Sequence, residues 1–150
     1  MFPGEVTGTR KRQNRITKNG KEGTHRMNVL CVERDRTKLR QLKQDIGELV
    51  SDAHITVCRD PYEAKSVAKA NGCDVLLTDT VFDGLHLDGV MLAEQIKQMN
   101  PRVNIVFITD RADPNAAYDA WRLGASAFLL RPYEKQRLAR VFTDPRFAAE

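Results

Sequence analysis

The stretch Asp74-Val75-Leu76-Leu77-Thr78-Asp79 places three consecutive apolar residues between polar neighbours. Gly72 precedes it and a segment rich in glycine and aspartate follows it, which is typical of a short strand buried on both faces. In an open parallel α/β sheet, ligands collect in the crevice beyond the carboxyl ends of the strands. Asp79 is therefore a candidate nucleophile or metal ligand, although taken alone it could equally be a loop residue or a helix cap.

Strand and helix patterns alternate along the chain on both sides of this stretch. Short apolar runs predict further strands at 28–32, 55–58, 103–108 and 127–130. Apolar residues spaced three and four apart, with Asp-Pro starts and glycine ends, predict helices at 39–50, 60–72, 90–99, 114–123 and 134–142. This alternation predicts an α/β fold with a doubly wound, five-stranded parallel sheet.

Length and cysteine usage limit the class of protein. A chain of 150 residues fits one domain of common size. No apolar run is long enough to cross a membrane, and the N-terminus lacks the apolar core of a secretory signal, so we expect a cytoplasmic protein. Cys31, Cys58 and Cys73 have no metal-like spacing. We interpret them as buried free thiols, which agrees with a reducing compartment.

The net charge of +4 comes from the N-terminal tail. Residues 1–26 hold seven basic and two acidic residues, whereas the remainder holds 17 basic and 18 acidic residues. The folded part therefore gives no electrostatic signal for direct nucleic-acid binding. We expect residues 1–26 to be a disordered basic tail and residues 144–150 a short C-terminal tail. Alternatively, the first tail is not translated, because Lys21-Glu22-Gly23 can be encoded by a purine run resembling a ribosome-binding site ahead of Met27.

Polar residues follow four of the five predicted strands. They are Glu33 and Asp35 after the first, Asp79 after the third, Thr109 after the fourth and Arg131 after the fifth. Neighbouring carboxylates suit a hard cation such as Mg²⁺, which shares its oxygen ligands with phosphate. A hydroxyl and a fixed positive charge suit the remaining phosphoryl oxygens, and a carboxylate among them can form an acyl phosphate. The combination favours phosphoryl chemistry more than any one residue does.

In order and spacing these pieces resemble the receiver domain of two-component response regulators, in the CheY-like superfamily, over roughly residues 27–143. The matching segments are Val29–Glu33, Asp74–Asp79, Asp88-Gly89, Val106–Thr109 and Gly124–Tyr133. The resemblance implies a flavodoxin-like (βα)5 fold and a phosphorelay protein without enzymatic activity of its own. A histidine kinase or phosphotransfer protein would phosphorylate Asp79. The stretch from Tyr118 to Tyr133 looks closest to regulators of the LytTR type.

The resemblance also implies a role for each site residue. Glu33 and Asp79 belong to an acidic metal site for Mg²⁺. Thr109 is the switch hydroxyl, Phe128 is the switch aromatic, and Arg131 stands where the family has a lysine. Phosphorylation would draw Thr109 toward the phosphoryl group and turn Phe128 inward. This would change the face made by the fourth helix, fifth strand and last helix, which could also form a homodimer.

Several residues depart from the family pattern. Arg34 replaces the second acid of the usual pair, so an arginine stands where a metal ligand is expected and the acidic pair is degenerate. Asp35 follows, but adjacent side chains on an extended segment point opposite ways, so it is a poor replacement. The guanidinium of Arg34 could instead neutralise Asp79 without metal. Arg131 is bulkier than lysine and forked, and Asp110 adds negative charge near the site.

These departures leave alternatives open. The leading hypothesis is a stand-alone or truncated receiver domain phosphorylated at Asp79. The alternative is a degenerate receiver, locked by Arg34, that binds partner proteins without phosphorylation. We do not expect an enzyme, because no glycine-rich phosphate loop follows the first strand and no Ser/His/Asp or Cys/His set is apparent. Tyr118 and Trp121 share one helix face and are expected first as core residues, and second as a partner surface.

Overall fold

Strands and helices alternate along residues 26–143, the part of the chain that the computed structural model describes. The strands are β2 (Met27–Val32), β3 (Ala53–Cys58), β4 (Val75–Thr78), β5 (Asn104–Thr109) and β6 (Ala127–Leu130). The helices are α1 (Arg36–Leu49), α2 (Pro61–Asn71), α3 (Gly89–Met99), α4 (Pro114–Arg122) and α5 (Lys135–Phe142). The predicted alternation is confirmed. The predicted tails, residues 1–26 and 144–150, lie outside the described residues except for Arg26.

Aspartate side chains start four of the helices. Asp35, Asp60, Asp88 and Asp113 stand at the N-caps of α1, α2, α3 and α4, where each carboxylate accepts a hydrogen bond from a backbone N–H of the first turn. Such caps satisfy donors that the helix itself leaves unpaired. Proline follows the cap in α2 and α4, where its missing N–H costs nothing. The predicted start of α2 at Asp60-Pro61 used this signal, whereas α1 begins at Arg36, three residues before the predicted start at residue 39.

The five strands form one parallel sheet in the order β3-β2-β4-β5-β6. The chain runs outward from β2 in both directions, so the order reverses between β2 and β4. Val32 is paired with Thr78 at the carboxyl ends of these two strands. Glu33 and Asp79, the next residues along, therefore emerge side by side at the topological switch point, where open α/β sheets bind their ligands.

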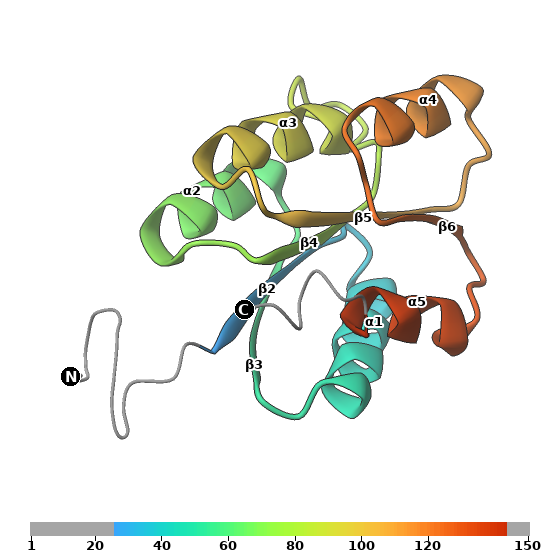
Figure 1. Ribbon diagram of the computed structural model, residues 1–150. Coiled ribbons are helices and arrows are strands. Elements are labelled where there is room, and N and C mark those ends of the chain that lie inside the picture. The colour runs from blue at the N-terminus through green and yellow to red at the C-terminus, as the bar shows by residue number, and fades with distance from the viewer. Residues whose placement is uncertain (1–25, 144–150) are drawn as a thin grey trace.

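Helices cover both faces of this sheet. Helices α2, α3 and α4 lie on one face and α1 and α5 on the other, as Figure 1 shows. Every residue of β4 and β5 is buried. Apolar side chains such as Leu76 and Phe107 face the first helical layer, whereas Leu77 and Val106 face the second. The double cover explains why these strands read as continuous apolar runs.

The three cysteines are buried free thiols, as predicted. Burial raises the pKa of Cys58 to about 11 and that of Cys73 to about 12, and it raises the pKa of Cys31 further. The thiolate form that reacts with electrophiles is therefore scarce at neutral pH. None of the helices within residues 26–143 combines the length and apolar character that a bilayer crossing requires.

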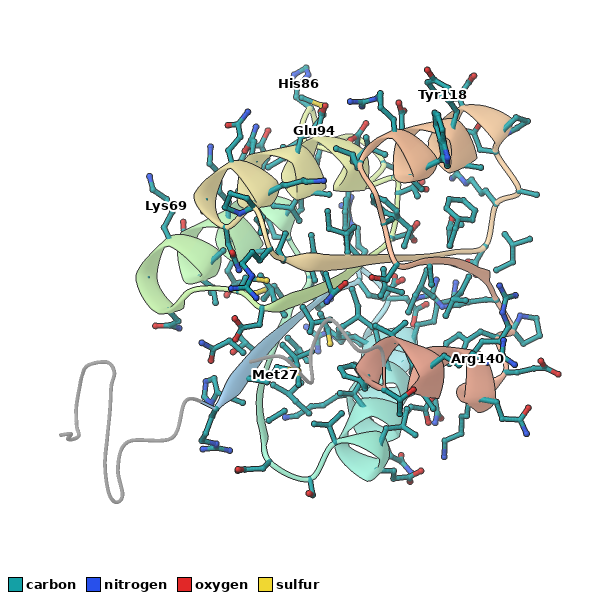
Figure 2. All side chains as sticks on the ribbon, in the orientation of Figure 1. Met27, Lys69, His86, Glu94, Tyr118 and Arg140 are labelled. Atoms are coloured by element: carbon teal, nitrogen blue, oxygen red, sulfur yellow. The ribbon has the colours of Figure 1, made fainter. Side chains whose placement is uncertain are left out.

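The expectation that Tyr118 and Trp121 pack in the core is wrong. Their side chains are 60% and 75% exposed, with ring centroids 5.8 Å apart. Figure 2 labels Tyr118 on α4. The two aromatics do share one helix face, but that face points to solvent. Small residues of α4, Ala116 and Ala120, face the sheet in their place. Periodicity alone could not tell which of the two faces is inner.

Candidate functional site

A pocket of about 340 Å³ opens beyond the carboxyl ends of β2, β4 and β5. It is lined by Glu33, Arg34, Asp35, Asp79, Val81, Asp83, Thr109, Asp110 and Arg111. Three of the predicted site residues, Glu33, Asp79 and Thr109, are thus brought together. Arg131 contacts two of the three from the end of β6. Strands that lie side by side and point the same way place these distant residues within reach of one another.

The two carboxylate oxygens of Asp79 have different surroundings. Its Oδ1 accepts a hydrogen bond from the backbone N–H of Thr80 at 2.6 Å. Its Oδ2 faces the guanidinium of Arg131 at 4.0 Å. The Asp79 side chain is 19% exposed, so it reaches the pocket while the strand end stays fixed. One oxygen is therefore held by the backbone and the other is available to a reacting group.

Arg131 and Glu33 form a buried ion pair. Arg131 Nη2 donates to Glu33 Oε1 at 2.7 Å, and the two side chains are only 12% and 5% exposed. The second Glu33 oxygen, Oε2, accepts a hydrogen bond from the backbone N–H of Asp35 at 2.8 Å. Arg131 Nη1 also lies 3.7 Å from Asp110 Oδ1. One guanidinium thus stands among three carboxylates, an arrangement that its planar fork of donors suits.

Arg34 does not bind Asp79. Its Nη1 donates to the backbone carbonyl of Asp83, and its own carbonyl accepts a hydrogen bond from Arg59 at 2.7 Å. Among the described side chains, Arg131 is the cation that pairs with Asp79. The geometry therefore lacks the contact by which Arg34 was expected to neutralise Asp79. Arg34 lies instead at the rim of the pocket.

Asp35 and Asp110 are held by helix α1. The Asp35 carboxylate accepts the backbone N–H of Lys38 at 3.0 Å as the N-cap, and this bond lowers the pKa of Asp35. Asp110 is hydrogen-bonded and ion-paired to the Lys38 ammonium, which holds the pKa of Asp110 below its usual range and raises the pKa of Lys38. The extra negative charge noted at Asp110 is therefore compensated. Lys38 was missed because nothing in the sequence marks a helix residue as facing the pocket.

Thr109 and Phe128 lie on the same face of neighbouring strands. Thr109 is buried, and its hydroxyl lies 3.4 Å from that of Thr80 and accepts the backbone N–H of Arg111 at 3.2 Å. Phe128 is half-buried and packs against Phe107, its partner in the β5–β6 register, with ring centroids 6.4 Å apart. Thr109 and Phe128 therefore stand two residues apart in register on this face of the sheet.

Residues 29–143 match the family profile described as "Response regulator receiver domain". The chain belongs to this family. Curated relatives include the DNA-binding transcriptional regulators NtrC of Klebsiella pneumoniae and Escherichia coli K12, each 38% identical over 61 residues, a match that covers 41% of this chain and 13% of the relative. The matched segment thus spans a small part of those proteins.

Solved receiver structures share the fold. A response regulator receiver domain protein from Clostridium thermocellum is 20% identical, with a TM-score of 0.71 over 82% of this chain and 96% of that one. Chemotaxis protein CheY4 of Vibrio cholerae is 16% identical, with a TM-score of 0.66 over 79% and 98%. These likenesses confirm the predicted flavodoxin-like fold, and the family match confirms the predicted domain type. The likeness to LytTR-type regulators stays a prediction.

Receiver domains are typically signalling modules without enzymatic activity, and they generally bind Mg²⁺ at an acidic pocket. The donors of this receiver do not fit a resident Mg²⁺, which prefers several oxygen ligands in octahedral geometry. Both carboxylate oxygens of Glu33 already accept a hydrogen bond, one from Arg131 and one from a backbone N–H, and the carboxylate of Asp35 caps α1. Within residues 26–143, no group of three or more histidine, cysteine, aspartate or glutamate side chains is arranged to hold a metal.

A second network anchors the segment that carries Arg131. The hydroxyl of Tyr133 donates to Asp45 Oδ2 at 2.6 Å, and Gln41 donates to Asp45 Oδ1 at 3.0 Å. Asp45 is a buried residue of α1, whereas Tyr133 lies between Arg131 and α5. Burial and the bond to Asp45 raise the pKa of Tyr133, so its proton is retained. The bond therefore ties the Arg131 segment to α1.

We expect Tyr133→Phe to lower the free energy of unfolding by about 1–3 kcal/mol, because it removes a donor from the buried carboxylate of Asp45. Urea unfolding followed by circular dichroism measures this change. The matched control is Tyr62→Phe, since Tyr62 is 48% exposed and its loss of a hydroxyl should leave the midpoint unchanged. Equal midpoints for the two variants would show that the Tyr133–Asp45 bond does not stabilise the fold.

Proposed function

We propose that this receiver domain accepts a phosphoryl group on Asp79 from a histidine kinase or a phosphotransfer protein, in the cytoplasm. The observation that supports this most is the geometry of Asp79. Its Oδ1 is fixed by the backbone of Thr80, and its Oδ2 faces both the pocket and the guanidinium of Arg131. A carboxylate held in this way is oriented for attack and needs little rearrangement.

The proposed step is a simple displacement at phosphorus. Oδ2 of Asp79 attacks the phosphorus of a phosphoramidate group, and a new O–P bond forms as the P–N bond breaks. The electron pair of that bond leaves with the nitrogen, which carries its own protons in phosphoramidate, whereas in phosphohistidine the proton is on the other ring nitrogen. The product is an aspartyl phosphate and a neutral amine or imidazole. Arg131, whose guanidinium lies beside Oδ2, offers N–H donors to the phosphoryl oxygens.

The proposed switch runs from Asp79 to the outer edge of the sheet. A phosphoryl group on Asp79 offers acceptor oxygens to the hydroxyl of Thr109, which now contacts Thr80. Thr109 shares its face of the sheet with Phe128, so its movement leaves room for that ring to turn inward. The surface formed by α4, β6 and α5 then changes. The exposed side chains of Tyr118 and Trp121 belong to this surface, which we also propose for homodimer formation.

We expect the protein to gain one phosphoryl group on incubation with phosphoramidate, and we expect Asp79→Ala to gain none, because it lacks the nucleophile. Intact-mass spectrometry measures the addition, with and without Mg²⁺. Asp52→Ala is the matched control, since it removes an exposed carboxylate remote from the pocket and should be modified like the wild type.

Two results would contradict the proposal. Equal addition to Asp79→Ala would place the phosphoryl group on another residue. No addition to the folded wild-type protein under either condition would favour the degenerate alternative, in which the receiver binds partners without phosphorylation. Circular dichroism of each variant excludes misfolding as the cause of a loss.

A further inference from the structure

We infer that Arg131 takes the place of the divalent cation in this receiver, so that phosphorylation of Asp79 proceeds without Mg²⁺. This inference rests on the proposed function of Asp79. The sequence alone does not say whether Arg34 or Arg131 lies beside the phosphoacceptor. In the structure, the guanidinium beside Asp79 belongs to Arg131 and not to Arg34.

The carboxylate oxygens of Glu33 are already engaged by other donors. A divalent cation between Glu33 and Asp79 would have to share the carboxylate oxygens of Glu33 with donors that already bind them. Both oxygens of Glu33 already accept hydrogen bonds, at 2.7 Å from Arg131 and 2.8 Å from the Asp35 backbone. The position after Glu33 carries Arg34, which has no acceptor atom in its side chain. Asp79 Oδ2 is thus the one oxygen of this pair that is not already hydrogen-bonded.

Arg131 places a fixed positive charge beside Glu33 and Asp79. The Arg131 side chain is only 12% exposed, and it is held by Glu33, by the carbonyl of Ile108 at 3.5 Å and by Asp110 at 3.7 Å. A metal ion between Glu33 and Asp79 would lie beside this fixed positive charge, which already neutralises part of the charge of Glu33, Asp79 and Asp110. Arg34 adds a second positive charge at the rim. Five carboxylates also line the pocket, so the positive charge that disfavours a metal ion is local to Arg131.

The guanidinium of Arg131 faces both Glu33 and the reacting oxygen of Asp79. Arg131 Nη1 is 4.0 Å from Asp79 Oδ2, while Nη2 is anchored on Glu33. The guanidinium is planar and rigid, so one edge can hold the anchor while the other faces the incoming phosphoryl oxygens. A lysine at this position would offer a single ammonium and could not serve both sides in the same way.

A metal-binding experiment tests the inference without phosphorylation. Mn²⁺ broadens the NMR signals of amides near its binding site, so it is added to ¹⁵N-labelled wild-type protein. We expect no selective broadening at Glu33, Asp79 or Thr80. The double variant Arg34→Asp/Arg131→Lys restores the acid and the lysine that the family has at these two positions. In this variant we expect selective broadening of the Glu33, Asp79 and Thr80 signals. Arg40→Asp, which makes the same charge change as Arg34→Asp on an exposed residue of α1, should behave like the wild type.

Phosphorylation by phosphoramidate is then timed by intact mass in Mg²⁺ and in EDTA. Equal rates for the wild type, together with Mg²⁺ dependence in the double variant, support the inference. Selective Mn²⁺ broadening in the wild type, or phosphorylation only in Mg²⁺, overturns it and leaves Asp79 as the phosphoacceptor. No phosphorylation of the folded wild type in either solution overturns the proposed function, and the inference with it.

Discussion

Gly89→Ala is expected to lower the free energy of unfolding by about 3 kcal/mol or more, at or beyond the upper end of the usual cost of overpacking. A Cβ at position 89 would lie 1.7 Å from the carbonyl oxygen of Asp79 and 2.7 Å from its carbonyl carbon. Both are backbone atoms, so no rotation of a side chain can relieve the clash. Either α3 or the end of β4 has to move.

The same displacement should impair the phosphoacceptor. Gly89 is the first residue of α3, and its N–H donates to the carbonyl of Thr80 at 2.9 Å. This hydrogen bond holds the start of α3 against Thr80, whose backbone N–H also fixes Asp79 Oδ1. Moving the backbone here misaligns the nucleophile, and a displacement of about 1 Å can cost roughly 100-fold in rate. We therefore expect Gly89→Ala to be phosphorylated far more slowly than the wild type.

Gly47→Ala is the matched control for this substitution. Gly47 lies in the exposed part of α1, and a Cβ there meets no atom within 4 Å. Alanine in the interior of a helix is favoured over glycine by about 0.5–1 kcal/mol, so this variant should be slightly more stable than the wild type. Urea denaturation of both variants measures the contrast. A Gly89→Ala protein as stable and as reactive as Gly47→Ala would contradict the close approach of α3 to Asp79.

The fold and the meeting of Glu33, Asp79, Thr109 and Arg131 were predictable because both follow from local patterns. Apolar runs define the strands, aspartate caps define the helix starts, and a parallel sheet brings the carboxyl ends of its strands to one edge. Knowing which strands carry these residues is therefore enough to bring them together.

The pairing of charges within the site was not predictable in the same way. Arg34 and Arg131 are both long and flexible, and the sequence does not say which one reaches Asp79. Burial decides it, because Arg131 is enclosed beside Glu33 while Arg34 turns outward to the carbonyl of Asp83. The outward face of Tyr118 on α4 is a similar case, since its orientation depends on the small residues that pack beneath the helix. Such side-chain orientations are set by tertiary packing, and the spacing of apolar residues in the sequence does not reveal them.

Arg131→Met is expected to lower the free energy of unfolding by about 3–5 kcal/mol, because it leaves the Glu33 carboxylate buried without its cation. The Glu33 side chain is only 5% exposed, so its carboxylate stays poorly solvated when that partner is removed. Methionine keeps much of the volume and the flexibility of the arginine stem, which limits the effect of a cavity. Urea unfolding measures the change, and phosphorylation of the same variant should be lost with the cation beside Asp79.

The double variant Arg131→Met/Glu33→Leu separates the lost ion pair from lost packing. If the cost of Arg131→Met arises from an uncompensated charge, removing that charge should recover most of the stability, because replacing a buried ion pair by apolar side chains of similar volume is often neutral. The coupling energy from the complete cycle, including Glu33→Leu alone, should then be about 3 kcal/mol or more, at or above the upper end of the usual range for residues in contact. Additive effects of the two single substitutions would contradict the pairing, and they would also remove the anchor by which Arg131 is held against Asp79.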